Sequence, residues 1–130
     1  MTRMAAEIAL KLEETAALHA EAFSAAEVLH GPAAIAEAGF PVLALRLADA
    51  AAAGLDATAA RLAAQGARVF VTGPAAPAGA VPLALVPPLH PLLDGLAAIA
   101  TFYGLAEALA RARGHDPDRP RHLCKVTQTR

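Results

Sequence analysis

The sequence has few of the residues on which many classes of site depend. Its 130 residues include one cysteine, Cys124, and no tryptophan, and aromatic residues make up 4%. A single cysteine excludes a disulfide within the chain and a zinc site built from cysteines. Such cysteine usage is typical of a reducing compartment, so we expect a cytoplasmic protein.

The chain also lacks an excess of charge of either sign. It carries 11 basic and 12 acidic residues, which give a formal net charge of −1. Proteins that hold nucleic acid or an anionic membrane surface need a positive field, and none is present here. We therefore expect neither nucleic acid nor a membrane as a partner. A single small phosphate could still be bound by local groups.

The one long charge-free run does not have the composition of a membrane span. It covers residues 69–93 and contains six prolines, at positions 74, 77, 82, 87, 88 and 91. A simple spanning helix would not tolerate them. The first residues carry Arg3, Glu7 and Lys11 where a secretory signal would need an apolar run, so we expect no signal peptide.

Apolar runs separated by glycine and proline predict a chain of alternating helices and strands. The predicted helices cover residues 4–20, 24–31, 32–38, 56–65 and 91–113, and the predicted strands cover 41–47, 68–72 and 81–86. Asp56 is the expected cap of its helix, which follows a loop at 48–54. Ser24 and Glu27 have the spacing of a capping box, so a short helix should begin there and end near Gly31.

This order predicts an α/β fold with a parallel sheet and helices on both faces, a three-layer αβα arrangement. Sheets of this class usually have about five strands, and only three are predicted here. A helix at residue 4 with no strand before it is also unusual for the class. We therefore expect that the chain begins inside a domain and lacks that domain's first strand.

Three segments resemble the C-terminal sugar isomerase (SIS) domain of the glucosamine-fructose-6-phosphate aminotransferase family. They are ALKLEE at 9–14, HAEAFSAAEVLHGP at 19–32 and DPDRPRHLCKVT at 116–127. They occur in the family's order and at plausible spacing, and they extend over almost the whole chain.

The resemblance implies that residues 1–130 form part of a C-terminal SIS domain. Residues 1–114 would be the α/β body, and residues 115–130 a C-terminal tail that carries an active-site lysine. It also implies a homodimer and no cofactor. The family's first SIS domain, whose Ser/Thr-rich loops bind the sugar phosphate, and its glutaminase domain have no counterpart in these residues.

Lys11 and Glu14 lie three residues apart, so both point to one helix face. Aldose–ketose interconversion needs a group that carries a proton between C1 and C2 of an open-chain sugar and a donor near the oxygens. In the family, the glutamate that matches Glu14 carries the proton, and Lys11 would polarise an oxygen. The alternative is an ordinary surface ion pair, which is common and weak.

His30 and Lys125 match two further catalytic residues of the family. His30 would open the sugar ring and would reach the active site of the neighbouring subunit, whereas a structural reading makes it a buried histidine that donates to a backbone carbonyl. Lys125 matches the lysine that forms a Schiff base with the keto sugar, which requires an unprotonated amine. A nucleophilic role for Cys124 is not expected, because no His and Asp/Asn pattern accompanies it.

Two acidic residues of the same motifs, Glu13 and Glu21, are the expected substrate-binding residues. Glu13 stands where the family has a second lysine, which removes a positive charge near the expected substrate-binding region. The alternative for Glu21 is a solvated position at a helix end, and His19 is read as structural. The remaining histidines share no ligand spacing, so no metal is expected.

The leading hypothesis is an isomerase-type SIS domain that acts on amino or keto hexose 6-phosphates through an enediol or enolamine. Two alternatives stay open. The first is a glucosamine-6-phosphate deaminase of the SIS type, because the ending KVTQT resembles stand-alone SIS proteins. The second is a non-catalytic module for sugar-phosphate binding or dimerisation.

Overall fold

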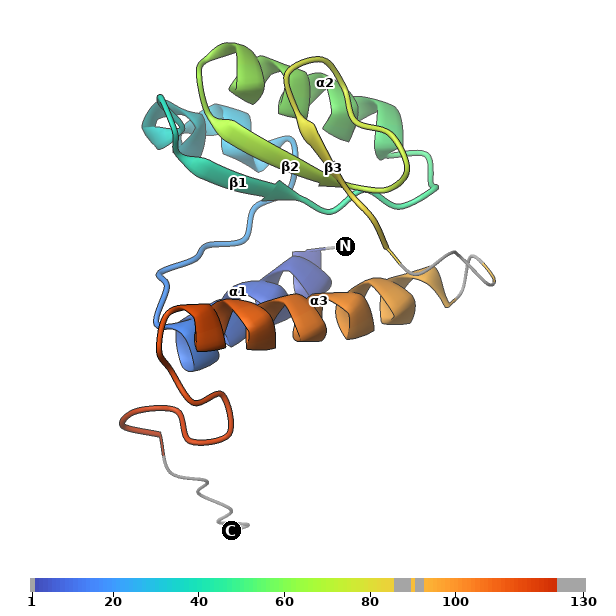
Figure 1. Ribbon diagram of the computed structural model, residues 1–130. Coiled ribbons are helices and arrows are strands. Elements are labelled where there is room, and N and C mark those ends of the chain that lie inside the picture. The colour runs from blue at the N-terminus through green and yellow to red at the C-terminus, as the bar shows by residue number, and fades with distance from the viewer. Residues whose placement is uncertain (1, 86–89, 91–92, 124–130) are drawn as a thin grey trace, which may run out of the picture.

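The computed structural model describes residues 2–85, 90 and 93–123 and shows an α/β arrangement (Figure 1). In chain order the elements are α1 (Thr2–Ala16), the 3₁₀ turns η1 (Glu27–His30) and η2 (Pro32–Ile35), β1 (Pro41–Ala44), α2 (Ala52–Ala64), β2 (Arg68–Thr72), β3 (Val81–Leu83) and α3 (Asp94–Ala112). This confirms the predicted alternation of helices and strands.

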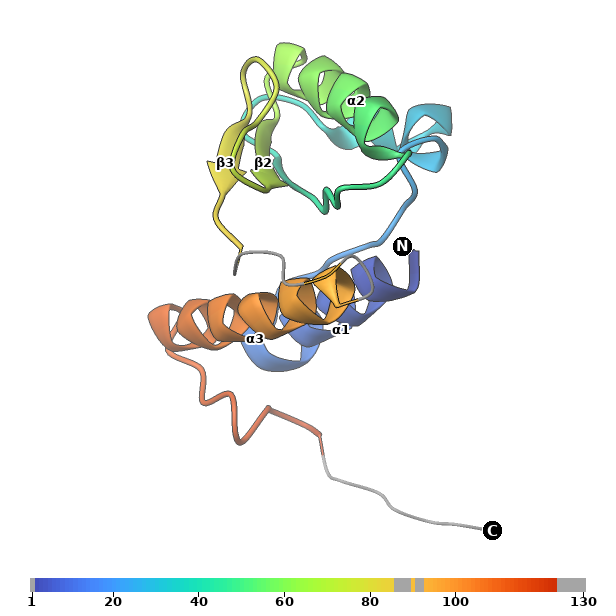
Figure 2. The ribbon, with the colours of Figure 1, turned by 90° about the vertical axis from the view of Figure 1, so that its right-hand side faces the viewer.

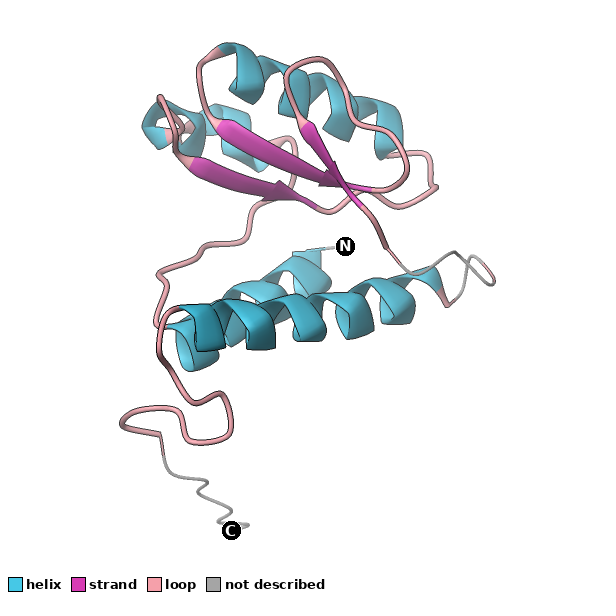
Figure 3. Cartoon of the chain, viewed as in Figure 1, coloured by secondary structure: helices cyan, strands magenta, loops and turns pink. Residues whose placement is uncertain are grey.

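The strands form one parallel sheet in the order β1-β2-β3. Val42 pairs with Val69, and Phe70 pairs with Val81. Parallel neighbours need a connection that carries the chain back to the starting edge. Helix α2 is that connection between β1 and β2, and the loop at 73–80 joins β2 to β3 (Figure 3).

One face of the sheet is covered by α2 and η2. Side chains of a strand alternate between faces, and Val69 and Val71 of β2 are almost completely buried on this side. They form a core with Leu62 of α2 and with a set of small residues, which comprises Ala36, Ala59 and Ala67. Because alanine contributes little apolar area, this core is thin.

The other face is covered by α1 and α3, which lie side by side (Figures 1 and 2). Phe102 of α3 and Ile8 of α1 form a second core cluster, against which Leu43 and Leu45 pack. Helix α2, the sheet and the α1–α3 pair are therefore three layers, as predicted. Near the ends of both helices, Arg113 Nε donates a hydrogen bond of 2.8 Å to the carbonyl oxygen of Ala16.

The helical boundaries near the N-terminus differ from the prediction. Helix α1 ends at Ala16 rather than at residue 20, because Ala17 has a φ of 50°, in the left-handed region that does not continue an α-helix. The amide nitrogen of Leu18 turns back to the carbonyl oxygen of Leu12, at 3.2 Å. The two short helices are 3₁₀ turns rather than α-helices.

The expected cap at Asp56 is wrong. Helix α2 begins at Ala52, inside the predicted loop, so Asp56 lies one turn into the helix and pairs with Arg46. Strands β1 and β3 end at Ala44 and Leu83, earlier than predicted. Helix α3 begins at Asp94; part of the predicted start at 91–93 and residue 86 of the third predicted strand lie outside the described residues.

Candidate functional site

The predicted pair of Lys11 and Glu14 is formed on α1. Lys11 Nζ lies 2.6 Å from Glu14 Oε2, and each side chain is 31% exposed. The helical spacing of three residues places both groups on one face. The pair is therefore a close charge-assisted contact that is partly shielded from solvent but still accessible.

The hydrogen bond to Glu14 raises the pKa of Lys11 above its ordinary value, and the charges of Glu14 and Glu7 act in the same direction. Partial burial opposes the shift to a smaller extent. Lys11 is therefore an ammonium group at neutral pH. It can donate to and polarise an oxygen, but it is not poised as a base or a nucleophile.

Two further residues extend this polar array. Glu7 Oε1 lies 4.0 Å from Lys11 Nζ and accepts a hydrogen bond of 2.7 Å from the hydroxyl of Tyr103. That bond raises the pKa of Tyr103. Sequence reasoning missed both residues: the spacing of Glu7 from Lys11 was visible, but Tyr103 lies on α3, and nothing in the sequence connects it to α1.

A pocket of about 230 Å³ opens beside Lys11. It lies against α1, α3 and the first residues of the tail, and its lining consists of Lys11, Thr15, Tyr103, Ala106, Glu107, Pro117 and Asp118. The turn at Asp116, whose carboxylate accepts the amide of Asp118 at 3.0 Å, brings the tail to this pocket. Lys125 and Cys124 lie outside the described residues.

Glu13 and Glu21 point to a different group, the exposed side chain of His19. Glu13 Oε1 lies 3.6 Å from His19 Nδ1, and Glu21 Oε1 lies 3.9 Å from His19 Nε2. Neither glutamate is among the described residues that line the pocket beside Lys11. Their substrate-binding roles stay predictions.

His30 is exposed at the end of η1, and the chain does not bring it to Lys11 and Glu14. The segment around it lies on the α2 side of the sheet, whereas α1 lies on the other side (Figure 1). Thr58 of α2 donates to the carbonyl oxygen of Ala25 at 3.4 Å, which ties this segment to α2. The buried-histidine alternative is wrong, and a contribution to a neighbouring subunit stays a prediction.

The reciprocal hydrogen bonds of the predicted capping box beside His30 are formed, although the 3₁₀ turn begins at Glu27 rather than at Ser24. The amide of Ser24 donates to Glu27 Oε2 at 2.8 Å, and the amide of Glu27 donates to Ser24 Oγ at 3.2 Å. The backbone amide of Ser24, and to a lesser extent its side-chain hydroxyl, hold the pKa of the Glu27 carboxyl below its ordinary value. The position of His30 therefore follows from local hydrogen bonding.

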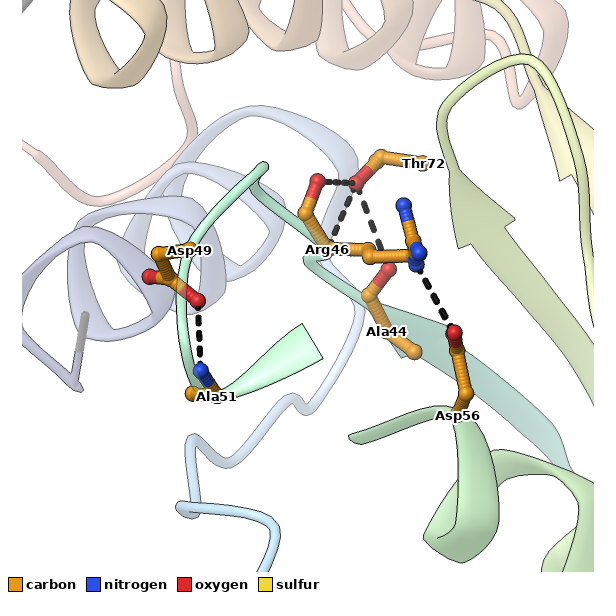
Figure 4. Close-up of polar contacts among 6 residues, drawn as sticks. All are labelled: Ala44, Arg46, Asp49, Ala51, Asp56 and Thr72. Carbon is orange, nitrogen blue, oxygen red and sulfur yellow. Dashed lines mark hydrogen bonds and ion pairs between the residues drawn. The ribbon is translucent and has the colours of Figure 1, made fainter. Parts of the chain in front are cut away.

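A second polar cluster lies where β1 and β2 end, and the sequence did not indicate it (Figure 4). Thr72 is buried, accepts the amide of Arg46 at 2.7 Å and lies 3.0 Å from the carbonyl oxygen of Arg46. Arg46 Nε contacts both carboxylate oxygens of Asp56, at 2.9 and 3.0 Å. The cluster joins β1, β2 and α2 and is best explained as a structural connection.

Within the described part of the chain, no group of three or more His, Cys, Asp or Glu side chains is arranged to hold a metal ion. Nor is any helix among those residues long and apolar enough to cross a membrane.

The chain is similar to curated glutamine–fructose-6-phosphate aminotransferases. It is 39% identical to the protein of Aeropyrum pernix over 131 residues and 37% identical to that of Leifsonia xyli over 130 residues. These alignments cover 95% and 94% of the chain but only 21% of each relative. The chain thus spans about a fifth of the length of these relatives. No protein-family model matches it.

Two solved structures share the fold. One, from Silicibacter pomeroyi and assigned as a phosphosugar isomerase, is 49% identical with a TM-score of 0.79, covering 88% of this chain and 35% of that one. The other is the C-terminal domain of glucosamine-fructose-6-phosphate aminotransferase from Francisella tularensis. It is 25% identical with a TM-score of 0.79, and the match covers 91% of this chain and 34% of that one.

Proposed function

The chain is a homologue of the C-terminal SIS domain of the glutamine–fructose-6-phosphate aminotransferases, and we propose that it contributes to the isomerisation of a hexose 6-phosphate. The observation that carries the proposal is the ion pair of Lys11 and Glu14, at 2.6 Å beside an open pocket. The substrate class is an amino or keto hexose phosphate, as the names of the relatives suggest.

Glu14 is the proposed proton carrier. As a carboxylate it removes a proton from C1 of the open-chain ketose, the electrons move onto the C2 carbonyl oxygen, and an enediolate forms, or an enolamine where C2 is held as a Schiff base. The same carboxyl group returns the proton to C2 while the proton of the C1 hydroxyl passes to the oxygen or nitrogen on C2, so that C1 becomes the aldehyde carbon of the aldose. The ammonium of Lys11 stabilises the negative charge that develops on the oxygen during both transfers.

His30 and Lys125 are proposed to complete the site. Exposed on the α2 side of the sheet, His30 is free to enter the site of a second subunit, where it would exchange a proton with the ring oxygen. Lys125 would bind the keto group as a Schiff base from the tail, whose first residues pass beside Lys11. The active form is then a cytoplasmic homodimer. Glu13 and Glu21 are assigned to the edge of the substrate site.

Activity of the chain alone and after mixing with a first-SIS-domain fragment tests this proposal. The remainder of the Silicibacter pomeroyi relative, of which this chain matches 35%, supplies a suitable first-domain fragment. We expect the mixture to interconvert fructose 6-phosphate and an aldose phosphate. Glu14→Gln should lower turnover by roughly 10²- to 10⁴-fold. Glu37→Gln, an exposed glutamate that does not line the pocket, is the matched control and should retain activity within a few-fold.

A non-catalytic module for sugar-phosphate binding or dimerisation is the second candidate, because the segment that contains His30 is tied to α2, on the side of the sheet opposite α1 (Figure 1). Binding of a hexose 6-phosphate without turnover in the mixture would favour the module and contradict the isomerase proposal. Release of ammonia from glucosamine 6-phosphate would instead identify a deaminase, which shares the ring opening and proton transfer.

A further inference from the structure

The position of Lys11 between two glutamates of α1 requires an explanation. Glu7 precedes Lys11 by four residues and Glu14 follows it by three, so all three side chains lie along one helix face. A glutamate four residues before a lysine is the more favourable arrangement for a helical ion pair. Intrinsic helix geometry therefore favours Glu7 as the partner of Lys11.

The structure shows the opposite preference. Lys11 Nζ lies 2.6 Å from Glu14 but 4.0 Å from Glu7. The oxygen of Glu7 that faces Lys11 is Oε1, and this same atom accepts the hydroxyl of Tyr103 at 2.7 Å. Tyr103 thus already donates to the oxygen of Glu7 that faces Lys11.

The contact depends on the packing of α1 against α3. The two helices lie side by side beneath the sheet (Figure 2), and Tyr103 is on the side of α3 that lines the pocket beside Lys11. Glu7 and Glu14 flank Lys11, whereas the hydroxyl of Tyr103 comes from a separate element. Because the Tyr103 hydroxyl binds the carboxylate of Glu7, the Lys11 ammonium pairs with the carboxylate of Glu14.

We infer that Tyr103 is a positioning residue, which acts through Glu7 to keep the Lys11 ammonium in contact with Glu14. The inference rests on the proposed function, because it concerns the lysine and glutamate assigned to proton transfer. Tyr103 itself needs no contact with the substrate. Without its hydroxyl, Glu7 is free to draw the ammonium away from the group that carries the proton.

The test measures where Lys11 is held, independently of activity. Lys11 and Lys125 are the two lysines of the sequence, so a chain labelled with ¹³C-lysine gives two side-chain signals, which Lys125→Arg assigns. The pKa of Lys11 is then followed by NMR in Glu14→Gln and Glu7→Gln, each with Tyr103 and with Tyr103→Phe. Glu107→Gln is the control, because Glu107 lines the same pocket but pairs with Arg111.

With Tyr103 present, Glu14→Gln should lower the pKa of Lys11 more than Glu7→Gln does. With Tyr103→Phe, the effect of Glu7→Gln should grow and that of Glu14→Gln should shrink, because the ammonium has moved toward Glu7. The inference is overturned if each glutamate substitution changes the pKa of Lys11 by the same amount with Tyr103 as with Tyr103→Phe. It is also overturned if, with Tyr103 present, Glu7→Gln changes that pKa more than Glu14→Gln does. Glu107→Gln should leave the ranking unchanged.

Activity separates this inference from the proposed function. In an active assembly, Tyr103→Phe should lower kcat by about tenfold with little change in KM, since substrate binding is retained while the reacting groups are misplaced. Unchanged kcat overturns the role in the reaction. An unmodified chain that neither binds nor converts a hexose phosphate contradicts the proposed function, and the NMR measurement still decides whether Tyr103 positions Lys11.

Discussion

The buried hydroxyl of Thr72, at the end of β2, accepts a hydrogen bond of 2.7 Å from the backbone amide of Arg46, beyond the end of β1. The same oxygen lies 3.0 Å from the carbonyl oxygen of Arg46, to which the hydroxyl donates. The two strands are therefore joined by a side chain at the point where their backbone pairing ends (Figure 4).

Replacing Thr72 by valine should destabilise the fold by about 1–3 kcal/mol, because the amide of Arg46 loses its partner in a buried position. Thr72→Ser keeps the hydroxyl, so its free energy of unfolding should decrease less than that of Thr72→Val. Urea unfolding followed by circular dichroism measures both variants. A loss of stability in Thr72→Ser as large as that in Thr72→Val would contradict the expectation, because it would show that the retained hydroxyl does not preserve stability.

The ion pair of Arg46 and Asp56 should contribute only weakly, since both side chains are about one-third exposed. A double-mutant cycle with Arg46→Gln and Asp56→Asn should give a coupling of about 1 kcal/mol or less. The coupling should decrease in 1 M salt, where screening acts within about 3 Å. A coupling that does not respond to salt would contradict a charge interaction.

Stability at acidic pH should depend on Glu27. Its pKa is lowered in the folded chain, chiefly by the backbone amide of Ser24, so its contribution is present above the ordinary carboxyl pKa and is lost as the pH falls through the lowered value. The difference in Tm between the unaltered chain and Glu27→Gln should therefore shrink on acidification. A difference that is constant from neutral to acidic pH would contradict the capping role.

The hydroxyl of Tyr103 should ionise at a lower pH in Glu7→Gln, because the carboxylate that raises its pKa is removed. Tyr103 is the single tyrosine of a chain without tryptophan, so tyrosinate absorbance reports this hydroxyl alone. The raised pKa also means that this contact stabilises the fold below the ordinary tyrosine pKa and is lost as the pH rises through the raised value. An unchanged titration would show that the contact is absent in solution.

Complementation between two inactive variants tests the placement of His30. If each site takes Glu14 from one subunit and His30 from the other, a mixed dimer of Glu14→Gln and His30→Asn contains one intact site. Random mixing in the active assembly should then restore about a quarter of the full activity. If both residues act within one chain, no intact site forms and no activity returns.

Local patterns predicted a large part of this structure. The capping box of Ser24 and Glu27 and the pair of Lys11 and Glu14 involve residues three apart, so the periodicity of one turn was enough to place them. The cap expected at Asp56 failed because helix α2 begins at Ala52, after a turn in which Asp49 accepts the amide of Ala51 at 2.9 Å. Asp56 therefore lies inside the helix, where it pairs with Arg46, a contact that helix propensity does not encode.

By itself, the sequence determined the order of helices and strands, the parallel α/β class and the candidate proton-transfer pair, because each follows from spacing within one element or from segments that resemble a known family. Only the tertiary structure decided which groups surround that pair. Tyr103 meets Glu7 across 96 positions, and the segment that contains η1 lies on the α2 side of the sheet, whereas α1 lies on the other side (Figure 1). Such relationships arise from the packing of separate elements, which no local periodicity encodes.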